Sequence, residues 1–133
     1  LPLGKACYLT QGNDLTIITY GAPVHKALEI IKKIDTHTFD LIDLRSLCPL
    51  DKDAIINSVK KTGKAIILQE DSMFGGLASE ISSIIMESCF EYLDAPVIRV
   101  ASLDTPIPFE KSLEDQYLPY DRFEVELKKL LNY

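Results

Sequence analysis

Short apolar runs alternate with segments of helical periodicity along most of this 133-residue chain. The apolar runs at 15–20, 39–43, 65–69 and 96–100 have the length of strands, and turn-forming residues border them. Between them, apolar residues recur at spacings of three and four, as on one face of a helix. This alternation predicts an α/β layer structure with a largely parallel sheet. A weaker run at 6–10 is expected to add an edge strand.

The ends of the expected helices are marked by residues with suitable backbone preferences. Pro23 suits a first helical turn, Asp51 is placed to cap a second helix, and Gly63 is placed to end it. A third helix follows the glycines at 75 and 76, and a fourth begins near Asp121. The core-facing residues predicted for these last two are Leu77, Ile81, Ile84, Ile85 and Ser88, and Phe123, Leu127, Leu130 and Leu131. The proline-containing segment 101–119 is expected to be extended.

Length, hydrophobicity and charge limit what the chain can be. With 47% hydrophobic residues, 1–133 is expected to form one domain with its own core. No apolar run reaches the roughly 18 residues of a membrane span. The net charge is −6, and the segment 70–115 carries ten acidic residues against two basic ones. This argues against nucleic acid as the main partner and leaves two interpretations, a solvated acidic face or a docking surface for a basic partner.

The cysteines and histidines give no catalytic or metal site. Three cysteines at 7, 48 and 89 are odd in number and lack C-x-x-C spacing, so we expect neither disulfides nor zinc, and a reduced intracellular setting. Cys48, between Leu47 and Pro49, is expected to be a buried, inert thiol. His25 and His37 have no recognisable Ser or Cys partner in the sequence.

No phosphate-binding motif is complete either. The segment "SVKKTGKA" has Ser58 where a P-loop requires glycine, and Ala65 where it requires Ser or Thr. The glycines before the third helix could hold an anion weakly, but close helix packing is the preferred interpretation.

Four charged residues are predicted at the carboxyl ends of strands, where open α/β sheets bind ligands. They are Asp43, Arg45, Glu70 and Asp71. One interpretation is a ligand pocket. The preferred alternative is an ion-pair network that fixes the loops.

Seven motifs, in order and with plausible spacing, resemble the C-terminal domain of the beta subunit of thiamine-diphosphate-dependent 2-oxoacid dehydrogenases, of the pyruvate or branched-chain 2-oxoisovalerate type. They are "PLGKA" (2–6), "GNDLTIITYG" (12–21), "DLRSLCPLD" (43–51), "SVKKTGKAIILQED" (58–71), "GGLASEI" (75–81), "LDAPVIRV" (93–100), and "DTPIP" with the following "LED" (104–115).

The resemblance implies a transketolase C-terminal fold: three layers, α/β/α, around a five-stranded mixed sheet that is mostly parallel, with the first strand antiparallel. Residues 1–5 would be a linker from a missing N-terminal pyrimidine-binding domain. Thiamine diphosphate and Mg would belong to the intact enzyme, and its catalytic His to the missing domain. No catalytic, cofactor-binding or metal-binding residue is therefore expected in this chain, and 43–71 would be scaffold.

The resemblance also implies assembly functions. The expected partners are a second beta subunit, the alpha part of the enzyme, and the basic subunit-binding domain of the dihydrolipoyl acyltransferase, with no membrane partner. Asp94 and the terminal carboxylate of Tyr133 match the places where that basic domain would dock. Alternatively, Asp94 only caps a turn before Ala-Pro. The expected location is the bacterial cytoplasm, or the mitochondrial matrix of a eukaryote.

A second functional hypothesis is an independent small-ligand-binding domain that reuses the same fold. In that case Arg45 and Glu70 would line the ligand pocket.

Overall fold

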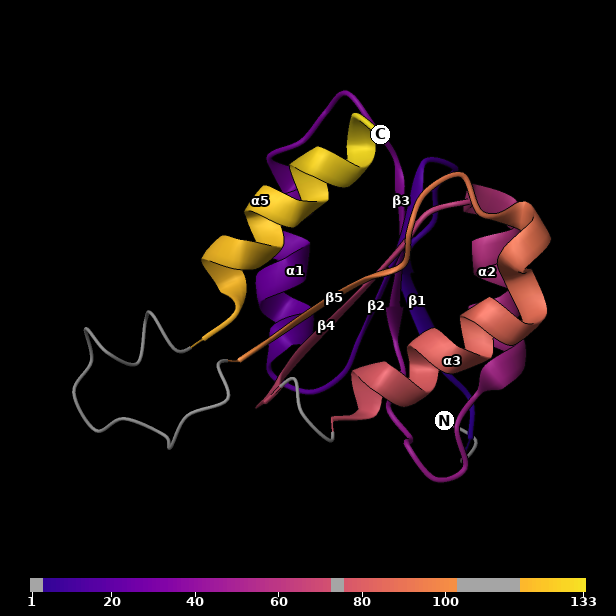
Figure 1. Ribbon diagram of the computed structural model, residues 1–133. Coiled ribbons are helices and arrows are strands. Elements are labelled where there is room, and N and C mark those ends of the chain that lie inside the picture. Colours follow the sequence, from indigo (N-terminus) through magenta and orange to yellow (C-terminus); the bar gives the residue numbers. More distant parts are fainter. Residues whose placement is uncertain (1–3, 73–75, 103–117) are drawn as a thin grey trace.

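A five-stranded mixed sheet forms the centre of the molecule (Figure 1). The computed structural model describes residues 4–72, 76–102 and 118–133. The strands are β1 (Cys7–Thr10), β2 (Leu15–Thr19), β3 (Phe39–Asp43), β4 (Ala65–Ser72) and β5 (Ile98–Ser102), and they lie in the order β1-β3-β2-β4-β5. Only the β1–β3 pair is antiparallel among these pairings. The predicted mixed sheet with an antiparallel first strand is confirmed.

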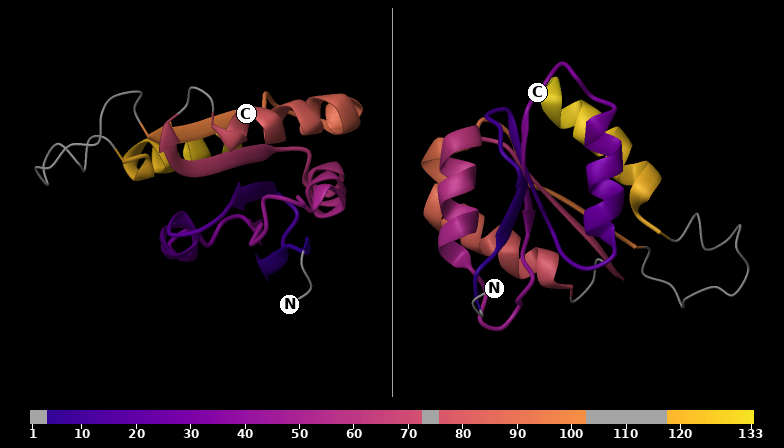
Figure 2. Two further views of the ribbon diagram at one scale, coloured as in Figure 1. Left: turned by 90° about the horizontal axis from the view of Figure 1, so that it is seen from below. Right: turned by 180° about the vertical axis from the view of Figure 1, so that it is seen from behind.

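Helices cover both faces of the sheet. One face carries α1 (Pro23–Lys32) and α5 (Tyr120–Leu131), and the other carries α2 (Lys52–Thr62) and α3 (Leu77–Cys89). A short 3-10 turn, η1 (Phe90–Tyr92), follows α3. Figure 2 shows the same layers from below and from behind. None of the described helices is long and apolar enough to cross a membrane.

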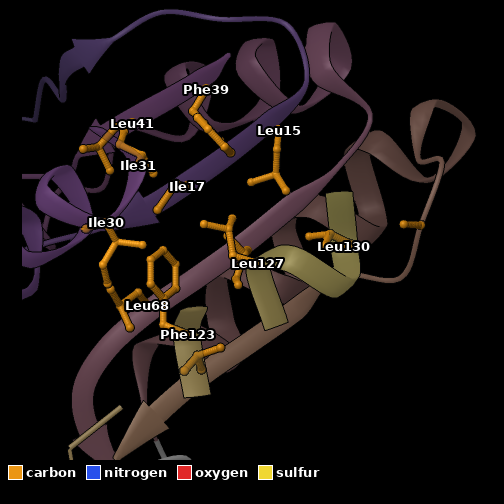
Figure 3. Close-up of a cluster of buried hydrophobic side chains, with 14 residues drawn as sticks. Leu15, Ile17, Ile30, Ile31, Phe39, Leu41, Leu68, Phe123, Leu127 and Leu130 are labelled. Atoms are coloured by element: carbon orange, nitrogen blue, oxygen red, sulfur yellow. The ribbon is translucent and has the colours of Figure 1, made fainter. Parts of the chain in front are cut away.

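The core consists of two apolar clusters, because alternate residues of each strand point to opposite faces. On one face, Leu15 and Ile17 of β2 meet side chains of α1 and α5 (Figure 3). On the other, Ile18 packs with residues of α2 and α3. Phe123 of α5 is fully buried. Since burying such a side chain contributes about 1.5–3 kcal/mol, α5 is held firmly against the sheet.

The ends of α2 follow the prediction. Asp51 Oδ1 accepts a hydrogen bond from the backbone N–H of Ala54 at 3.2 Å, and Oδ2 accepts one from Ala6 at 2.8 Å. Asp51 therefore caps the helix and also ties the start of the chain to it. Gly63 ends the helix in the left-handed conformation, with φ at +76°.

Several predicted boundaries and one core residue are wrong. The fourth predicted strand begins at Ile98 rather than at Pro96, because proline has no N–H to donate to the ladder. β4 extends beyond 69 to Ser72. In α3, Ser88 is exposed and Cys89 is buried in its place, since the apolar thiol takes the inward position. Most of the predicted extended segment 101–119, and of the linker 1–5, lies outside the described residues.

Candidate functional site

The structure brings Asp94 and Tyr133 together, although 39 positions separate them in the sequence. Both line a depression of about 330 Å³ beside the end of α3. We call it the Asp94–Tyr133 depression. Its lining residues are Met86, Phe90, Leu93, Asp94, Ala95, Pro96 and Tyr133. Phe90 and Tyr133 are 66% and 72% exposed, so apolar and aromatic surface faces solvent beside the carboxylate.

Asp94 is positioned through its backbone. Its N–H donates a hydrogen bond to the carbonyl oxygen of Gly63, the residue that ends α2, at 2.7 Å. Its side chain is exposed and has no hydrogen-bond partner among the residues that the structure describes. The carboxylate therefore does not act as a turn cap in the described part of the chain, and its oxygens can accept hydrogen bonds from another molecule.

Charged residues of both signs follow or precede the lining residues in the sequence or lie on neighbouring elements. Glu87 on α3 and Glu91 on η1 are both exposed. Lys60 of α2 lies with Nζ 5.1 Å from the ring centre of Tyr92, a cation–π contact. Asp94 is the acidic side chain among the lining residues, so a cationic side chain that enters the depression would meet its carboxylate.

The predicted strand-end residues do not form one cluster. β2 lies between β3 and β4, so the end of β3 and the end of β4 are two strands apart. Asp43 accepts a hydrogen bond from the backbone N–H of Arg45 at 3.1 Å, and its Oδ2 lies 3.7 Å from the Arg45 Nε. Arg45 adopts a left-handed backbone with φ at +57°. This local pair fixes the turn after β3.

Glu70 belongs to a different group, formed with α1 and α5. The hydroxyl of Tyr120, at the start of α5, donates a hydrogen bond to the Glu70 carboxylate. The Nζ of Lys26 on α1 lies 5.7 Å from the centre of the Tyr120 ring. Burial and the bond to Glu70 raise the pKa of Tyr120 above its ordinary value. Arg45 and Glu70 therefore do not meet, and the side chain of Asp71 lies outside the described set.

A buried polar network was missed by the sequence analysis. Asp40 of β3 is fully buried, and its carboxylate accepts hydrogen bonds from Gly12 N at 2.8 Å, Ser58 Oγ at 2.6 Å and Lys61 Nζ at 2.9 Å. The Ser58 hydroxyl also lies 2.7 Å from Thr16 Oγ1. The signal that could have revealed it is an acidic residue inside the apolar run "FDLID". The network joins β3 to α2, and so it supports the fold rather than a site.

The histidines and cysteines are dispersed. His25 is exposed on α1, and His37 lies in a loop with Nδ1 2.9 Å from Thr36 Oγ1. Cys48 was predicted to be buried, and this is wrong: it is exposed in the loop before α2. Cys89 is the buried cysteine, and burial raises the pKa of its thiol.

The described residues do not provide a site for thiamine diphosphate or its Mg ion. The first turn of α3 is the strongest candidate for binding phosphate, but the side-chain oxygen of Gln69 already accepts a hydrogen bond from Ala78 N at 2.8 Å. No group of three or more His, Cys, Asp or Glu side chains with metal-binding geometry is found within 4–72, 76–102 and 118–133. The side chains and helix end in these ranges therefore do not fit thiamine diphosphate and its Mg ion.

The solved structures include a close match in fold. A split-gene transketolase, described as an inactive beta4 tetramer, is similar over 99% of this chain and 43% of its own, with a TM-score of 0.81 and 27% sequence identity.

Curated proteins are similar over the whole length of this chain. The beta subunit of the pyruvate dehydrogenase E1 component of Rickettsia felis and the beta subunit of 2-oxoisovalerate dehydrogenase of Bacillus subtilis are each 39% identical over 100% of the chain. The chain spans 41% and 42% of those two proteins. The model of the transketolase C-terminal domain matches residues 4–122. The chain therefore belongs to the transketolase C-terminal domain family.

Proposed function

We propose that the chain is the C-terminal assembly domain of the beta part of a 2-oxoacid dehydrogenase. The intact enzyme would oxidatively decarboxylate a 2-oxoacid and transfer the acyl group to a lipoyl group, with thiamine diphosphate and Mg bound by other parts of it. Similarity over the whole chain to beta subunits of two such dehydrogenases supports this proposal. This chain alone would be inactive and would contribute binding surfaces.

The observation that carries the docking function is the position of Asp94. Its carboxylate lacks a described hydrogen-bond partner and lies beside exposed aromatic rings in the same depression as Tyr133. Aromatic residues such as Tyr133 are enriched among the few residues that supply most of the energy at protein interfaces, and Asp94 offers a carboxylate that a basic side chain can pair with. The partner that fits is a small basic domain, and we propose the subunit-binding domain of the dihydrolipoyl acyltransferase.

The electrostatics of the depression favour this partner kinetically. Glu87 and Glu91 directly follow the lining residues Met86 and Phe90 in the sequence and are exposed, and the chain as a whole carries a net charge of −6. A field of this sign speeds the approach of a basic domain and orients it. Phe90 and Tyr133 would then pack against the aliphatic parts of its Lys or Arg side chains.

The proposed assembly has two further contacts, one with the alpha part and one with a second beta chain. The similar split-gene transketolase is described as a beta4 tetramer, which supports self-association of such chains. The proposed location is the cytoplasm of a bacterium or the mitochondrial matrix of a eukaryote.

Titration calorimetry of this chain with the subunit-binding domain of an acyltransferase from the same organism tests the docking function. Asp94→Asn removes the charge and keeps the side-chain shape, and Asp35→Asn in the exposed loop after α1 is the matched control. We expect binding that weakens with salt, is about tenfold weaker for Asp94→Asn, and is unchanged for Asp35→Asn. Equal affinity of all three chains would contradict the proposal.

A further inference from the structure

Two adjoining depressions lie where the C-terminal ends of α1 and α5 meet the loop 33–38. The two helices lie side by side on one face of the sheet and end at the same side of the molecule (Figure 2). The depressions have volumes of about 320 and 260 Å³ and share the lining residues Ile34 and His37. We call the two together the His37 depression. None of its lining residues lines the Asp94–Tyr133 depression, so the two surfaces can bind different molecules.

Positive charge predominates in the His37 depression, although the chain as a whole is acidic. The lysines at its lining are Lys32, Lys33 and Lys128, and the acidic lining residue is Asp35. The whole chain carries −6, and the segment 70–115, with ten acidic and two basic residues, carries −8, so the remainder carries +2. The depression belongs to this remainder, and its local field attracts an anion.

The helix ends do not occupy the lysines of the depression. The last four carbonyl groups of a helix lack partners within it and attract cations. In α5 all four accept a hydrogen bond, three from the backbone N–H groups of Asn132 and Tyr133 and one from Lys64 Nζ at 3.5 Å. The ammonium groups of Lys33 and Lys128 have no hydrogen-bond or ion-pair partner among the residues that the structure describes. Both are therefore able to bind an anion.

His37 supplies a further hydrogen-bond donor. Its Nδ1 lies 2.9 Å from Thr36 Oγ1. When the Thr36 hydroxyl donates to Nδ1, the neutral ring carries its proton on Nε2 and keeps one N–H for a ligand. His37 is half-buried and lines both depressions, so a ligand bound in either one lies beside it. The exposed side-chain amides of Gln11 and Asn132 add further donors and acceptors to the lining.

Apolar side chains lie among these polar groups and limit what the ligand can be. Ile34 and Leu131 are partly buried and pack against the core cluster between the sheet and the helices α1 and α5. Asp35 contributes one carboxylate, which repels a highly charged ligand but accepts a hydrogen bond from a hydroxyl group. A volume of about 320 Å³ lies at the lower end of the range for small-molecule sites. A molecule with one phosphate group and a small organic part fits this lining.

We propose that the His37 depression binds a small organic phosphate. Lys33 and Lys128 hold the phosphate group, because an ammonium is a compact charge with three donors, and His37 donates a third contact. The organic part lies over Ile34 and Leu131. Since the lysines are exposed and water competes with them, we expect a dissociation constant of about 0.1–1 mM at low salt. This inference is independent of the proposed docking and self-association.

Titration of the labelled chain with adenosine monophosphate, followed by amide chemical shifts, tests the inference. Inorganic phosphate and adenosine are the comparison probes. We expect saturable shifts at 33–37 and 128–132, weaker binding of inorganic phosphate, and no binding of adenosine at the same concentrations. Lys33→Gln and Lys128→Gln should each raise the dissociation constant about tenfold. Lys129→Gln, which removes an exposed lysine from the same turn of α5, is the matched control and should leave the dissociation constant unchanged.

Each contrary outcome overturns a defined part of the inference. No saturable shift below about 10 mM adenosine monophosphate, or largest shifts around Asp94, overturns the site itself. Equal weakening by Lys129→Gln shows only general attraction of anions and also overturns the site. Adenosine that binds as tightly as its monophosphate overturns recognition of the phosphate group. Inorganic phosphate that binds as tightly as adenosine monophosphate overturns the role of Ile34 and Leu131.

Discussion

The carboxylate of Asp94 occupies the space that a side chain on Gly63 would need. A Cβ on Gly63 would lie 2.3 Å from Asp94 Oδ2 and 3.2 Å from the carbonyl oxygen of Tyr92. The Asp94 N–H donates to the Gly63 carbonyl in the same contact. The end of α2 thus determines where the Asp94 carboxylate stands, and we expect a change at Gly63 to affect both stability and the proposed docking.

Gly63→Ala should destabilise the chain and weaken docking. The left-handed φ of +76° costs a non-glycine residue about 1 kcal/mol, and the contact with Asp94 adds to it, so we expect a loss of about 2 kcal/mol in the free energy of unfolding. Gly21→Ala is a matched control, since Gly21 has a φ of +71° but nothing within 4 Å of its Cβ position. Urea denaturation should show the smaller loss for Gly21→Ala. Equal losses in the free energy of unfolding for the two variants would show that the Asp94 carboxylate does not clash with a side chain at position 63.

Asp40→Ala should be among the most damaging single changes. The fully buried Asp40 carboxylate accepts hydrogen bonds from Gly12, Ser58 and Lys61. The substitution removes this acceptor from all three donors. We expect a loss of about 3 kcal/mol in the free energy of unfolding, somewhat reduced because Lys61 can turn to solvent. Asp35→Ala, in an exposed loop, should cost less than about 0.5 kcal/mol in the same urea experiment. Similar losses for the two variants would refute the structural role of Asp40.

The Tyr120–Glu70 pair predicts a loss of stability in alkaline solution. Burial and Glu70 raise the pKa of Tyr120 in the folded chain, whereas the phenol of the unfolded chain titrates at its ordinary value of 10.0. The stabilising contribution is therefore complete below about pH 10 and declines as the pH rises above that value, because the unfolded state loses its proton first.

Tyr120→Phe isolates this contribution. The variant should lose about 1 kcal/mol near neutral pH with the hydrogen bond to Glu70, and its stability should fall less steeply above about pH 10. Unfolding curves at several pH values, with phenolate absorbance recorded alongside, measure both effects. An identical pH dependence in the two chains would contradict the assignment.

The three cysteines should react with a thiol reagent at different rates. Cys48 is exposed, Cys7 is half-buried, and Cys89 is buried with a raised pKa that reduces its thiolate fraction. In the native chain we expect one thiol to react rapidly with the reagent, and Cys48→Ser should remove this rapid phase. Cys89 should react only when the chain unfolds. A fast phase that persists in Cys48→Ser would show that the loop before α2 is arranged differently.

Periodicity in the sequence predicts the layers because each strand and helix must bury one face locally. The apolar run of β2 and the cap and stop at Asp51 and Gly63 are all features of adjacent residues, and each was predicted. Strand boundaries were less accurate, as the start of β5 shows, because pairing with a neighbour decides where a ladder begins.

Features that depend on strand order could not be predicted in this way. The sequence places Asp43 and Glu70 at strand ends, but only the order β3-β2-β4 shows that a strand separates them. The acidic residue in "FDLID" could have marked Asp40 itself, but its partners come from the segment before β2 and from α2, so no local pattern identifies them. Asp94 and Tyr133 were each suggested by resemblance to a family, and only their shared depression brings them together.

Mapping of amide chemical shifts while the basic subunit-binding domain is added to the labelled chain tests the proposed docking surface. We expect the largest shifts at Asp94 and its neighbours in the depression, including Phe90 and Tyr133, while Ile98 of β5 and Val125 of α5 change little. Largest shifts at Ile98 and Val125, or around the Glu70–Tyr120 pair, would contradict docking at Asp94.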